Sequence, residues 1–187
     1  LKCLPRTTHR ALKAMRGEPD QSRNDNVSFL GRRQRTVDFS FSAKMEFSPK
    51  GKEAAGILVM QASNHQYRLE KCREEGKSVL RLVLVTTWQN GLPFLPDYES
   101  RTTERVLHQE EIEEETLILK LEAKGQDYNF FWGTDEKNLR LFYEHADGRL
   151  INPEEVGGMV GTMLGVFATA NETDSSNWAQ FDWTELK

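Results

Sequence analysis

The sequence predicts an all-β protein, a sandwich of two antiparallel sheets, from two observations. Apolar side chains recur at every second position through most of the chain, which is the period of a strand with one buried face. About eleven such segments follow one another at short intervals with turn-forming residues between them, a pattern typical of a two-sheet sandwich. Helical periodicity is nearly absent; only Thr8–Arg16 fits a helix, which the following Gly17 and Pro19 would end.

The clearest strand runs from Thr36 to Phe47. Apolar side chains alternate there with polar ones and share one face: Val37, Phe39, Phe41, Ala43, Met45 and Phe47. This alternation predicts a half-buried antiparallel strand whose apolar face lies in the core.

Further strands follow the same logic. They are expected over Ala54–Gln61, His65–Cys72, Val79–Trp88, Glu104–Gln109, Thr116–Ala123, Asp127–Trp132, Leu139–Glu144, Val160–Thr169 and Trp178–Leu186. In the segment Leu139–Glu144, the alternation places Leu139, Leu141 and Tyr143 on the apolar face. The glycines inside Val160–Thr169 predict a bulge or a close approach of backbones.

The domain organisation is expected to be simple. With 187 residues and roughly 150 residues in a typical domain, one domain is predicted. We assign residues 28–187 to the sandwich and residues 1–27, which are polar and poorly patterned, to an N-terminal connecting segment. The acidic run Gln109–Glu115 is interpreted as a solvated connection or edge, with a calcium-binding cluster as the alternative.

Charge and hydropathy exclude several classes of partner. The chain carries 25 Lys and Arg against 29 Asp and Glu, so no nucleic-acid partner is expected. No apolar stretch approaches the roughly 20 residues of a membrane span, so no membrane partner is expected either. The chain begins at Leu1 without a leader, and both a cytoplasmic and a secreted location stay open.

Motifs of catalysis and metal binding are missing from the sequence. It contains no phosphate-binding loop, nucleophile elbow or zinc signature, so we expect no catalytic residue and no cofactor. The two cysteines, Cys3 and Cys72, are expected to be free thiols, with a single bridge as the alternative. Asp182, between Phe181 and Trp183 on the last strand, is a candidate ligand for structural calcium, against the alternative of an ordinary exposed carboxylate.

Aromatic side chains are the candidates for binding. Trp88, Phe94 and Tyr98 lie in or beside the loop Gln89–Glu99, which two prolines stiffen. A flat apolar ring matches the C–H face of a pyranose, so these three residues are candidates for stacking on carbohydrate. For aromatic residues within strands, packing in the core is the alternative reading.

Three segments together carry a resemblance to a known family. They are Phe29–Gln34, Ala55–Val59 followed by Asn64–Tyr67, and Gly157–Gly165 followed by Phe181–Trp183. In this order the chain from Ser28 to Lys187 resembles the C-terminal β-sandwich of the β-xylosidases and α-L-arabinofuranosidases of glycoside hydrolase family 43. The resemblance implies a concanavalin A-like jelly roll that follows a five-bladed propeller holding the catalytic carboxylates of an inverting glycosidase.

The resemblance implies an accessory role. A five-bladed propeller needs roughly 20 strands, which this chain does not have, so no catalytic residue is assigned. The implied partners are a family-43-type catalytic propeller, whose active site the domain would shape, and xylo- or arabino-oligosaccharides from xylan or arabinan.

One loop is implied to reach the mouth of that active site. The family commonly places a bulky apolar residue, often Phe, where this chain has Met159, and Gly158 precedes it. Methionine keeps the apolar character but loses the rigid ring, so this departure weakens the implied contact with substrate. The alternative is a plain hairpin turn with Met159 in the core.

Two other functions remain open. The chain is alternatively a free-standing carbohydrate-binding module or lectin, which would bind sugar without a partner through Trp88, Phe94 or Tyr98. A third hypothesis is a complete small glycosidase or lyase on the same scaffold, which would require hydrolysis by the chain alone.

Overall fold

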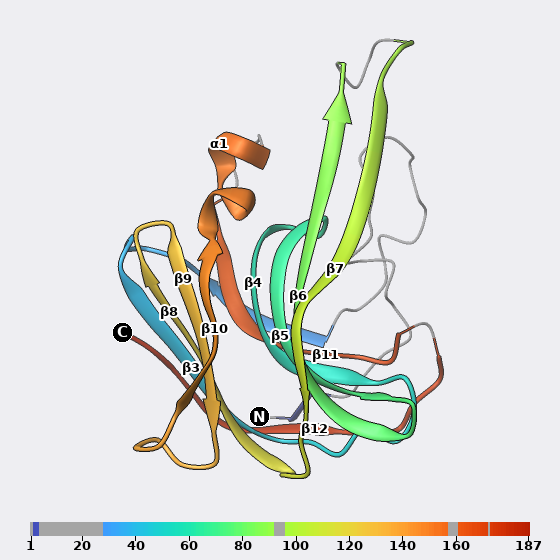
Figure 1. Cartoon of the computed structure of the whole chain (residues 1–187), viewed down its shortest axis with the longest axis vertical. Helices are drawn as coiled ribbons and strands as arrows, with labels where there is room; N and C mark the ends of the chain where they lie inside the picture. The colour runs from blue at the N-terminus through green and yellow to red at the C-terminus, as the bar shows by residue number, and fades with distance from the viewer. Residues whose placement is uncertain (1, 4–27, 92–95, 157–160, 172) are drawn as a thin grey trace.

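The computed structural model describes residues 2–3, 28–91, 96–156, 161–171 and 173–187. In these residues the chain forms two six-stranded sheets that pack face to face (Figure 1). Every strand pairing is antiparallel. The predicted all-β class and two-sheet antiparallel architecture are therefore confirmed.

Sheet A contains strands from both ends of the chain and from its central part. Its order is β1 (Lys2–Cys3), β12 (Ala179–Leu186), β3 (Phe39–Glu46), β8 (Thr116–Lys124), β9 (Asp127–Gly133) and β10 (Arg140–Asp147). Sheet B has the order β2 (Ser28–Arg33), β11 (Met163–Thr169), β4 (Ala54–Ala62), β5 (His65–Glu74), β6 (Lys77–Asn90) and β7 (Glu99–Glu111).

In the described part of the connection from β10 to β11 the chain forms two short helical turns. They are η2, a 3-10 helix over Gly148–Ile151, and α1 over Pro153–Val156. Among the described residues, no helix has the length and apolar character needed to cross a lipid bilayer. The expected helix over Thr8–Arg16 lies outside the described residues.

The alternation around β3 is confirmed for all but one of the expected core residues. Phe39, Phe41, Ala43, Met45 and Phe47 are all buried. Val37 was expected on the same face but is 68% exposed. It precedes β3, in the connection that carries the chain from sheet B to sheet A, and no facing sheet covers it there.

The prediction for the segment Leu139–Glu144 is wrong about Leu141, which was expected on the apolar face. Leu141 is 49% exposed and Phe142 is buried in its place, whereas Tyr143 packs partly buried against the core as expected. The pairing of β10 with β9 shifts register between Leu141 and Tyr143 and again between Tyr143 and Ala146. Each bulge inserts unpaired residues and reorients the side chains that follow, so a simple period of two fails in this strand.

Edge strands are the elements that the sequence pattern described least well. The expected strand Glu104–Gln109 is the centre of β7, which pairs with β6 over the whole length from Glu99 to Glu111. β2 was not predicted as a strand at all, yet it pairs with β11 along Ser28–Arg33. Both are edges of sheet B and largely exposed, so they lack the one-sided burial that creates apolar alternation.

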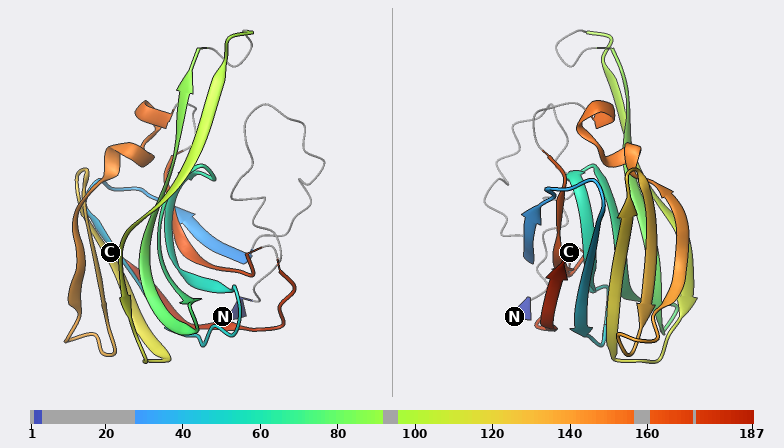
Figure 2. Two further views of the ribbon diagram at one scale, coloured as in Figure 1. Left: turned by 45° about the vertical axis from the view of Figure 1, so that its right-hand side comes forward. Right: turned by 90° about the vertical axis from the view of Figure 1, so that its left-hand side faces the viewer.

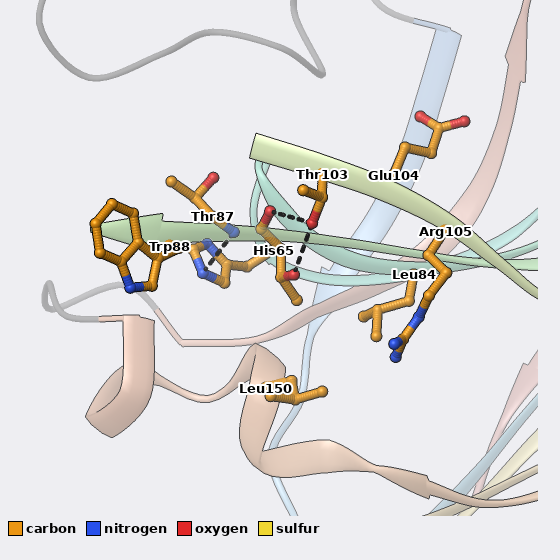
Figure 3. A pocket seen from close by; sticks show the side chains of 9 residues that line it. His65, Leu84, Thr87, Trp88, Thr103, Glu104, Arg105 and Leu150 are labelled. Carbon is orange, nitrogen blue, oxygen red and sulfur yellow. Dashed lines mark hydrogen bonds between the residues drawn. The ribbon is translucent and has the colours of Figure 1, made fainter. Parts of the chain in front are cut away.

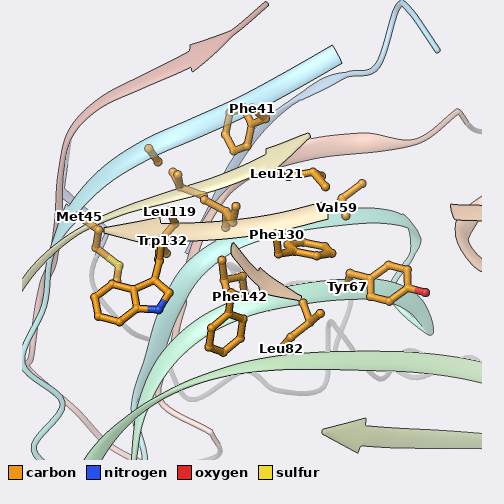
Figure 4. Close-up of a cluster of buried hydrophobic side chains, with 14 of the residues drawn as sticks. Phe41, Met45, Val59, Tyr67, Leu82, Leu119, Leu121, Phe130, Trp132 and Phe142 are labelled. Atoms are coloured by element: carbon orange, nitrogen blue, oxygen red, sulfur yellow. The ribbon is translucent and has the colours of Figure 1, made fainter. Parts of the chain in front are cut away.

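Aromatic side chains join the two sheets in the core (Figure 4). Tyr67 of sheet B lies 5.9 Å from Phe130 of sheet A, ring centre to ring centre, and 6.5 Å from Tyr128. Phe39 meets Tyr128 edge to face at 5.9 Å. Such aromatic pairs contribute about 0.5–1.5 kcal/mol each beyond the area that they bury, so this cluster stabilises the contact between the sheets.

Glycines allow two pairs of neighbouring strands in sheet B to approach closely, β11 with β2 and β4 with β5. A Cβ atom on Gly165 would lie 2.3 Å from the carbonyl oxygen of Leu30, and one on Gly56 would lie 2.0 Å from that of Leu69. Of the two expectations for the glycines in the segment Val160–Thr169, the close approach is confirmed at Gly165, and β11 pairs there without a register shift.

A buried ionic network lies on β5 and β6. The Glu70 carboxylate forms ion pairs with Arg68 at 3.3 Å and with Arg81 at 2.7 Å. The side chains of Glu70 and Arg68 are each only 2% exposed. Burial lowers the pKa of Arg81, but the charges of Glu70 and its neighbours outweigh it and raise that pKa above its usual value.

The hairpin β6–β7 extends beyond the rest of sheet B. The pairing of β5 with β6 ends at Gln66 and Val85, whereas β6 and β7 stay paired out to Asn90 and Glu99. We call the two-stranded extension, residues 86–90 and 99–103, the ribbon. Figures 1 and 2 show it rising past the sandwich, with α1 beside its base. An isolated two-stranded hairpin is marginally stable in water, so the ribbon depends on contacts at its base.

Candidate functional site

An open cleft lies between the base of the ribbon and the turn η2. Its volume is about 620 Å³. The residues that line it are His65, Leu84, Thr86, Thr87, Trp88, Thr103, Glu104, Arg105 and Leu150 (Figure 3). Its size lies within the range of about 300–1,000 Å³ that is usual for small-molecule sites.

The inner wall of the cleft is one face of the β6–β7 hairpin. Leu84, Thr86 and Trp88 alternate along β6 and therefore share a face. Across the hairpin, Leu84 pairs with Arg105 and Thr86 pairs with Thr103. Directly paired side chains lie on the same face of a sheet, so Arg105 and Thr103 join this wall.

A bulge decides which charged residue of β7 faces the cleft. Leu82 pairs with His108 but Val83 pairs with Val106, which leaves Leu107 as an extra residue. Without this register shift, Arg105 would change faces. Figure 3 shows the outcome: Arg105 points toward Leu150 of η2, and Glu104 points the opposite way.

The opposite wall is held in place by hydrogen bonds around η2. Asp147 caps this turn by accepting from the backbone N–H of Arg149 at 2.9 Å, and the Tyr67 hydroxyl donates to the Asp147 carbonyl at 3.0 Å. Hydrogen bonding to Arg149 lowers the pKa of Asp147. Leu150 therefore faces the ribbon from a fixed position.

Polar contacts clamp the base of the ribbon to the β4–β5 turn. Asn64 donates from Nδ2 to the Thr87 hydroxyl at 2.8 Å, and the Thr87 and Thr102 hydroxyls lie 2.8 Å apart. His65 is buried, and its Nε2 accepts from the Thr87 backbone N–H at 3.3 Å. An imidazole nitrogen that accepts this bond is not available as a free base, so His65 positions the ribbon.

Of the charged residues in and beside the cleft, the carboxylates form ion pairs and Arg105 does not. Glu104 forms an ion pair with Arg68 at 2.9 Å, and Asp147 forms one with Arg149 at 2.7 Å. Arg105 is exposed and forms no ion pair with any residue in the described part of the chain. The cleft therefore offers the Trp88 ring, several hydroxyls, the Arg105 guanidinium and the Glu104 carboxylate, which is already paired with Arg68, and this set suits binding of a polar ring-shaped ligand.

Of the residues proposed to stack on carbohydrate, the structure places one in the cleft. Trp88 is 57% exposed and lies at the outer end of the cleft (Figure 3). Tyr98 is half-buried just before β7, and it does not line the cleft. Phe94, like Gly158 and Met159 of the expected loop, lies outside the described residues.

The structure gives the calcium hypothesis at Asp182 no support. Asp182 is 66% exposed and forms an ion pair with Lys44 at 3.1 Å, as an ordinary surface carboxylate does. No three His, Cys, Asp or Glu side chains cluster as a metal site within the described ranges. The acidic run Gln109–Glu115 forms the exposed end of β7 and its connection to β8, with Ile112 alone buried.

Sequence reasoning missed Arg105 and Leu150. The alternation Leu84, Thr86, Trp88 was sufficient to place Thr86 beside Trp88. No local sequence signal marked Arg105, because its orientation depends on the bulge in β7. No local signal marked Leu150 either, because it lies in η2, in the connection between β10 and β11, far from β6 and β7 in the sequence.

The fold is that of a two-sheet antiparallel β-sandwich of the concanavalin A-like class. The family model described as the β-xylosidase C-terminal concanavalin A-like domain of glycoside hydrolase family 43 matches residues 6–187. The chain belongs to this family, and the predicted resemblance and the concanavalin A-like fold are confirmed.

Relatives with known names are longer glycosidases. A non-reducing end α-L-arabinofuranosidase of Bacteroides ovatus is 28% identical over 171 residues, which cover 88% of this chain and 28% of that protein. A xylosidase/arabinosidase of Butyrivibrio fibrisolvens is 29% identical over 159 residues, 84% of this chain and 28% of that protein. The solved structure of Bacteroides ovatus xyloglucan PUL GH43B superposes with a TM-score of 0.68 at 27% identity, over 88% of this chain and 30% of that one. The chain thus spans under a third of the length of each of these relatives.

Proposed function

We propose that the chain is the accessory, non-catalytic domain of a xylan- or arabinan-degrading glycosidase, and that it packs on a separate catalytic propeller and shapes its active site. The observation that carries this proposal is the match to a C-terminal domain family over residues 6–187, together with the 28% of each named glycosidase that the chain covers.

The chemistry of the cleft supports a role in contact rather than hydrolysis. An inverting glycosidase needs two carboxyl groups about 6.5–9.5 Å apart across the scissile bond. Glu104 is the one carboxylate among the residues that line the cleft, and its partner is Arg68. The domain is therefore proposed to add binding contacts to a reaction that the propeller carries out.

The ribbon end is proposed to face the propeller. It combines the exposed Trp88 with a protruding pair of strands, and α1, which ends at Val156, lies beside it (Figure 1). Gly158 and Met159 follow α1 in the sequence, and we retain them as the proposed contact with substrate.

The first experiment is the size and activity of the native polypeptide. An antibody against this chain is used to purify the protein from its source, and the product is assayed on aryl β-xyloside and aryl α-L-arabinofuranoside. A polypeptide far larger than 21.6 kDa with glycosidase activity is the expected result. A band near 21.6 kDa without activity would contradict the accessory role.

A variant of the native polypeptide then tests the orientation. Trp88→Ala is expected to reduce kcat/KM on oligosaccharides while the matched variant Trp178→Ala, also exposed but outside the cleft, leaves it unchanged. Equal effects of the two variants would contradict docking through the ribbon end.

A free-standing carbohydrate-binding module is the second candidate, and Trp88 in an open cleft is the observation that favours it. It predicts that the 187-residue chain binds xylo- or arabino-oligosaccharides without a partner. Titration calorimetry distinguishes the two functions when it is combined with the size of the native polypeptide: binding together with a native size near 21.6 kDa supports the free-standing module, and a much larger glycosidase supports the accessory role.

A further inference from the structure

The guanidinium of Arg105 is the feature of the cleft that the proposed function leaves unexplained. Its side chain points across the cleft toward Leu150 (Figure 3). The carboxylates nearest along the chain and around η2 are already engaged, Glu104 with Arg68 and Asp147 with Arg149. Within the described residues, Arg105 itself forms no ion pair, so its guanidinium has no direct carboxylate partner.

The other groups of the cleft are suited to a sugar ring. Trp88 presents an exposed indole at the outer end, and Leu84 and Leu150 supply apolar walls. The Thr86 and Thr103 hydroxyls, 3.5 Å apart, add neutral hydrogen-bonding groups on the same face as Arg105. An aromatic ring and hydroxyls fit any pyranose, so by themselves they do not select among sugars.

We infer that the cleft binds an acidic sugar, a uronic acid residue carried by a plant-type oligosaccharide, with Arg105 receiving the carboxylate and Trp88 stacking on a ring of the same chain. A guanidinium and a carboxylate match in plane and spacing and form two parallel N–H···O bonds. This inference names the substrate class of the cleft, and it rests on the proposed function only in that the cleft contacts carbohydrate.

The orientation of Arg105 is built into the fold. The register shift between Leu82 and Val83 turns Arg105 to the inner face, and the same shift turns Glu104 outward to Arg68. With the unshifted register a carboxylate would face the cleft and repel an acidic sugar. The bulge thus sets the sign of the charge that a ligand meets.

The test compares two ligands that differ only in charge. Xylotriose carrying one glucuronic acid residue is titrated into the 187-residue chain at 50 mM salt, alongside the same oligosaccharide with its carboxyl group reduced to an alcohol. Because charge-assisted hydrogen bonds are about twice as strong as neutral ones, we expect the acid to bind at least about tenfold more tightly. The difference is expected to shrink at 500 mM salt, since exposed charges are screened.

Variants identify the group responsible. Arg105→Gln is expected to reduce the affinity for the acidic oligosaccharide to the affinity for the neutral one. Trp88→Ala is expected to reduce the affinity for both oligosaccharides. Arg32→Gln, which removes an exposed arginine of β2 outside the cleft, serves as the matched control and is expected to change neither. The melting temperature of each variant shows that it is folded.

Each other outcome overturns the inference. Equal affinity for the two ligands, a preference for the acid that persists in Arg105→Gln, or no binding of either ligand at millimolar concentration excludes the acidic-sugar site. Competition by 50 mM sodium acetate that abolishes binding of the acid would indicate a site for small anions only. None of these results depends on an attached propeller, so the inference and the proposed function fail independently.

Discussion

The substitution Glu70→Gln tests whether the buried ionic network stabilises the fold. It keeps the shape of the side chain and removes its charge. Arg68, whose side chain is 2% exposed, and Arg81, whose side chain is 17% exposed, would then lose their shared carboxylate.

The expected cost follows from the contacts. The Glu70 carboxylate accepts from Nε of Arg81 at 2.8 Å and lies 3.3 Å from Nε of Arg68. Removing one partner of a buried ion pair costs about 3–5 kcal/mol. Because Arg81 keeps Glu74 and Arg68 keeps Glu104, we expect a loss at the lower end, about 3 kcal/mol in the free energy of unfolding.

Urea denaturation followed by tryptophan fluorescence measures this loss. At about 2–4 °C per kcal/mol for a chain of this size, the melting temperature should fall by about 6–12 °C. Glu111→Gln is the matched control, because its ion pair with Lys77 at 2.6 Å is 63–64% exposed. Such a surface pair is worth less than about 1 kcal/mol.

The comparison between Glu70→Gln and Glu111→Gln shows whether the buried ionic network stabilises the fold more than a surface ion pair does. A loss in Glu70→Gln no larger than that in Glu111→Gln would mean that burial adds nothing to the network. A change in the slope of the urea transition would instead indicate that the variant alters the unfolded or folded state as a whole.

The remaining predictions concern packing, ionisation and reactivity. Gly165→Ala places a Cβ 2.3 Å from the Leu30 carbonyl, so it should cost at least about 1–3 kcal/mol and lower the melting temperature; an unchanged value would contradict the close approach. Burial raises the pKa of Tyr128 to about 12, above its value of about 10 in the unfolded chain. The folded state therefore holds the proton more tightly, so stability is complete below pH 10 and falls as pH rises through 12, and Tyr128→Phe should flatten that decline in urea titrations. Cys72 is a free, buried thiol whose pKa burial raises to about 12, so in a Cys3→Ser background a thiol reagent at pH 8 should react only after unfolding; rapid reaction of the native protein would be inconsistent with this burial.

Much of the fold was predictable because one-sided burial imposes a period of two. β3 shows this most clearly, since its inward side chains from Phe39 to Met45 are all buried. The prediction failed where this condition does not hold. β7 and β2 are exposed edges, and β10 carries two register shifts that put Phe142 rather than Leu141 in the core.

The cleft was predictable in part. Trp88 was singled out because it precedes a stiffened loop, and the structure places it at the outer end of the cleft. Leu150 was not, because η2 joins the cleft from the connection between β10 and β11. Residues so distant in sequence meet only through the packing of one sheet against the other.

The sequence by itself determined the all-β class, the alternating core strands and the membership in a family of C-terminal glycosidase domains, because each of these is written in local periodicity or in short motifs. Only the tertiary structure decided which charge faces the cleft. A single extra residue in β7 reverses every side chain beyond it, and the position of that residue depends on how the edge strand pairs with β6, which no local pattern encodes.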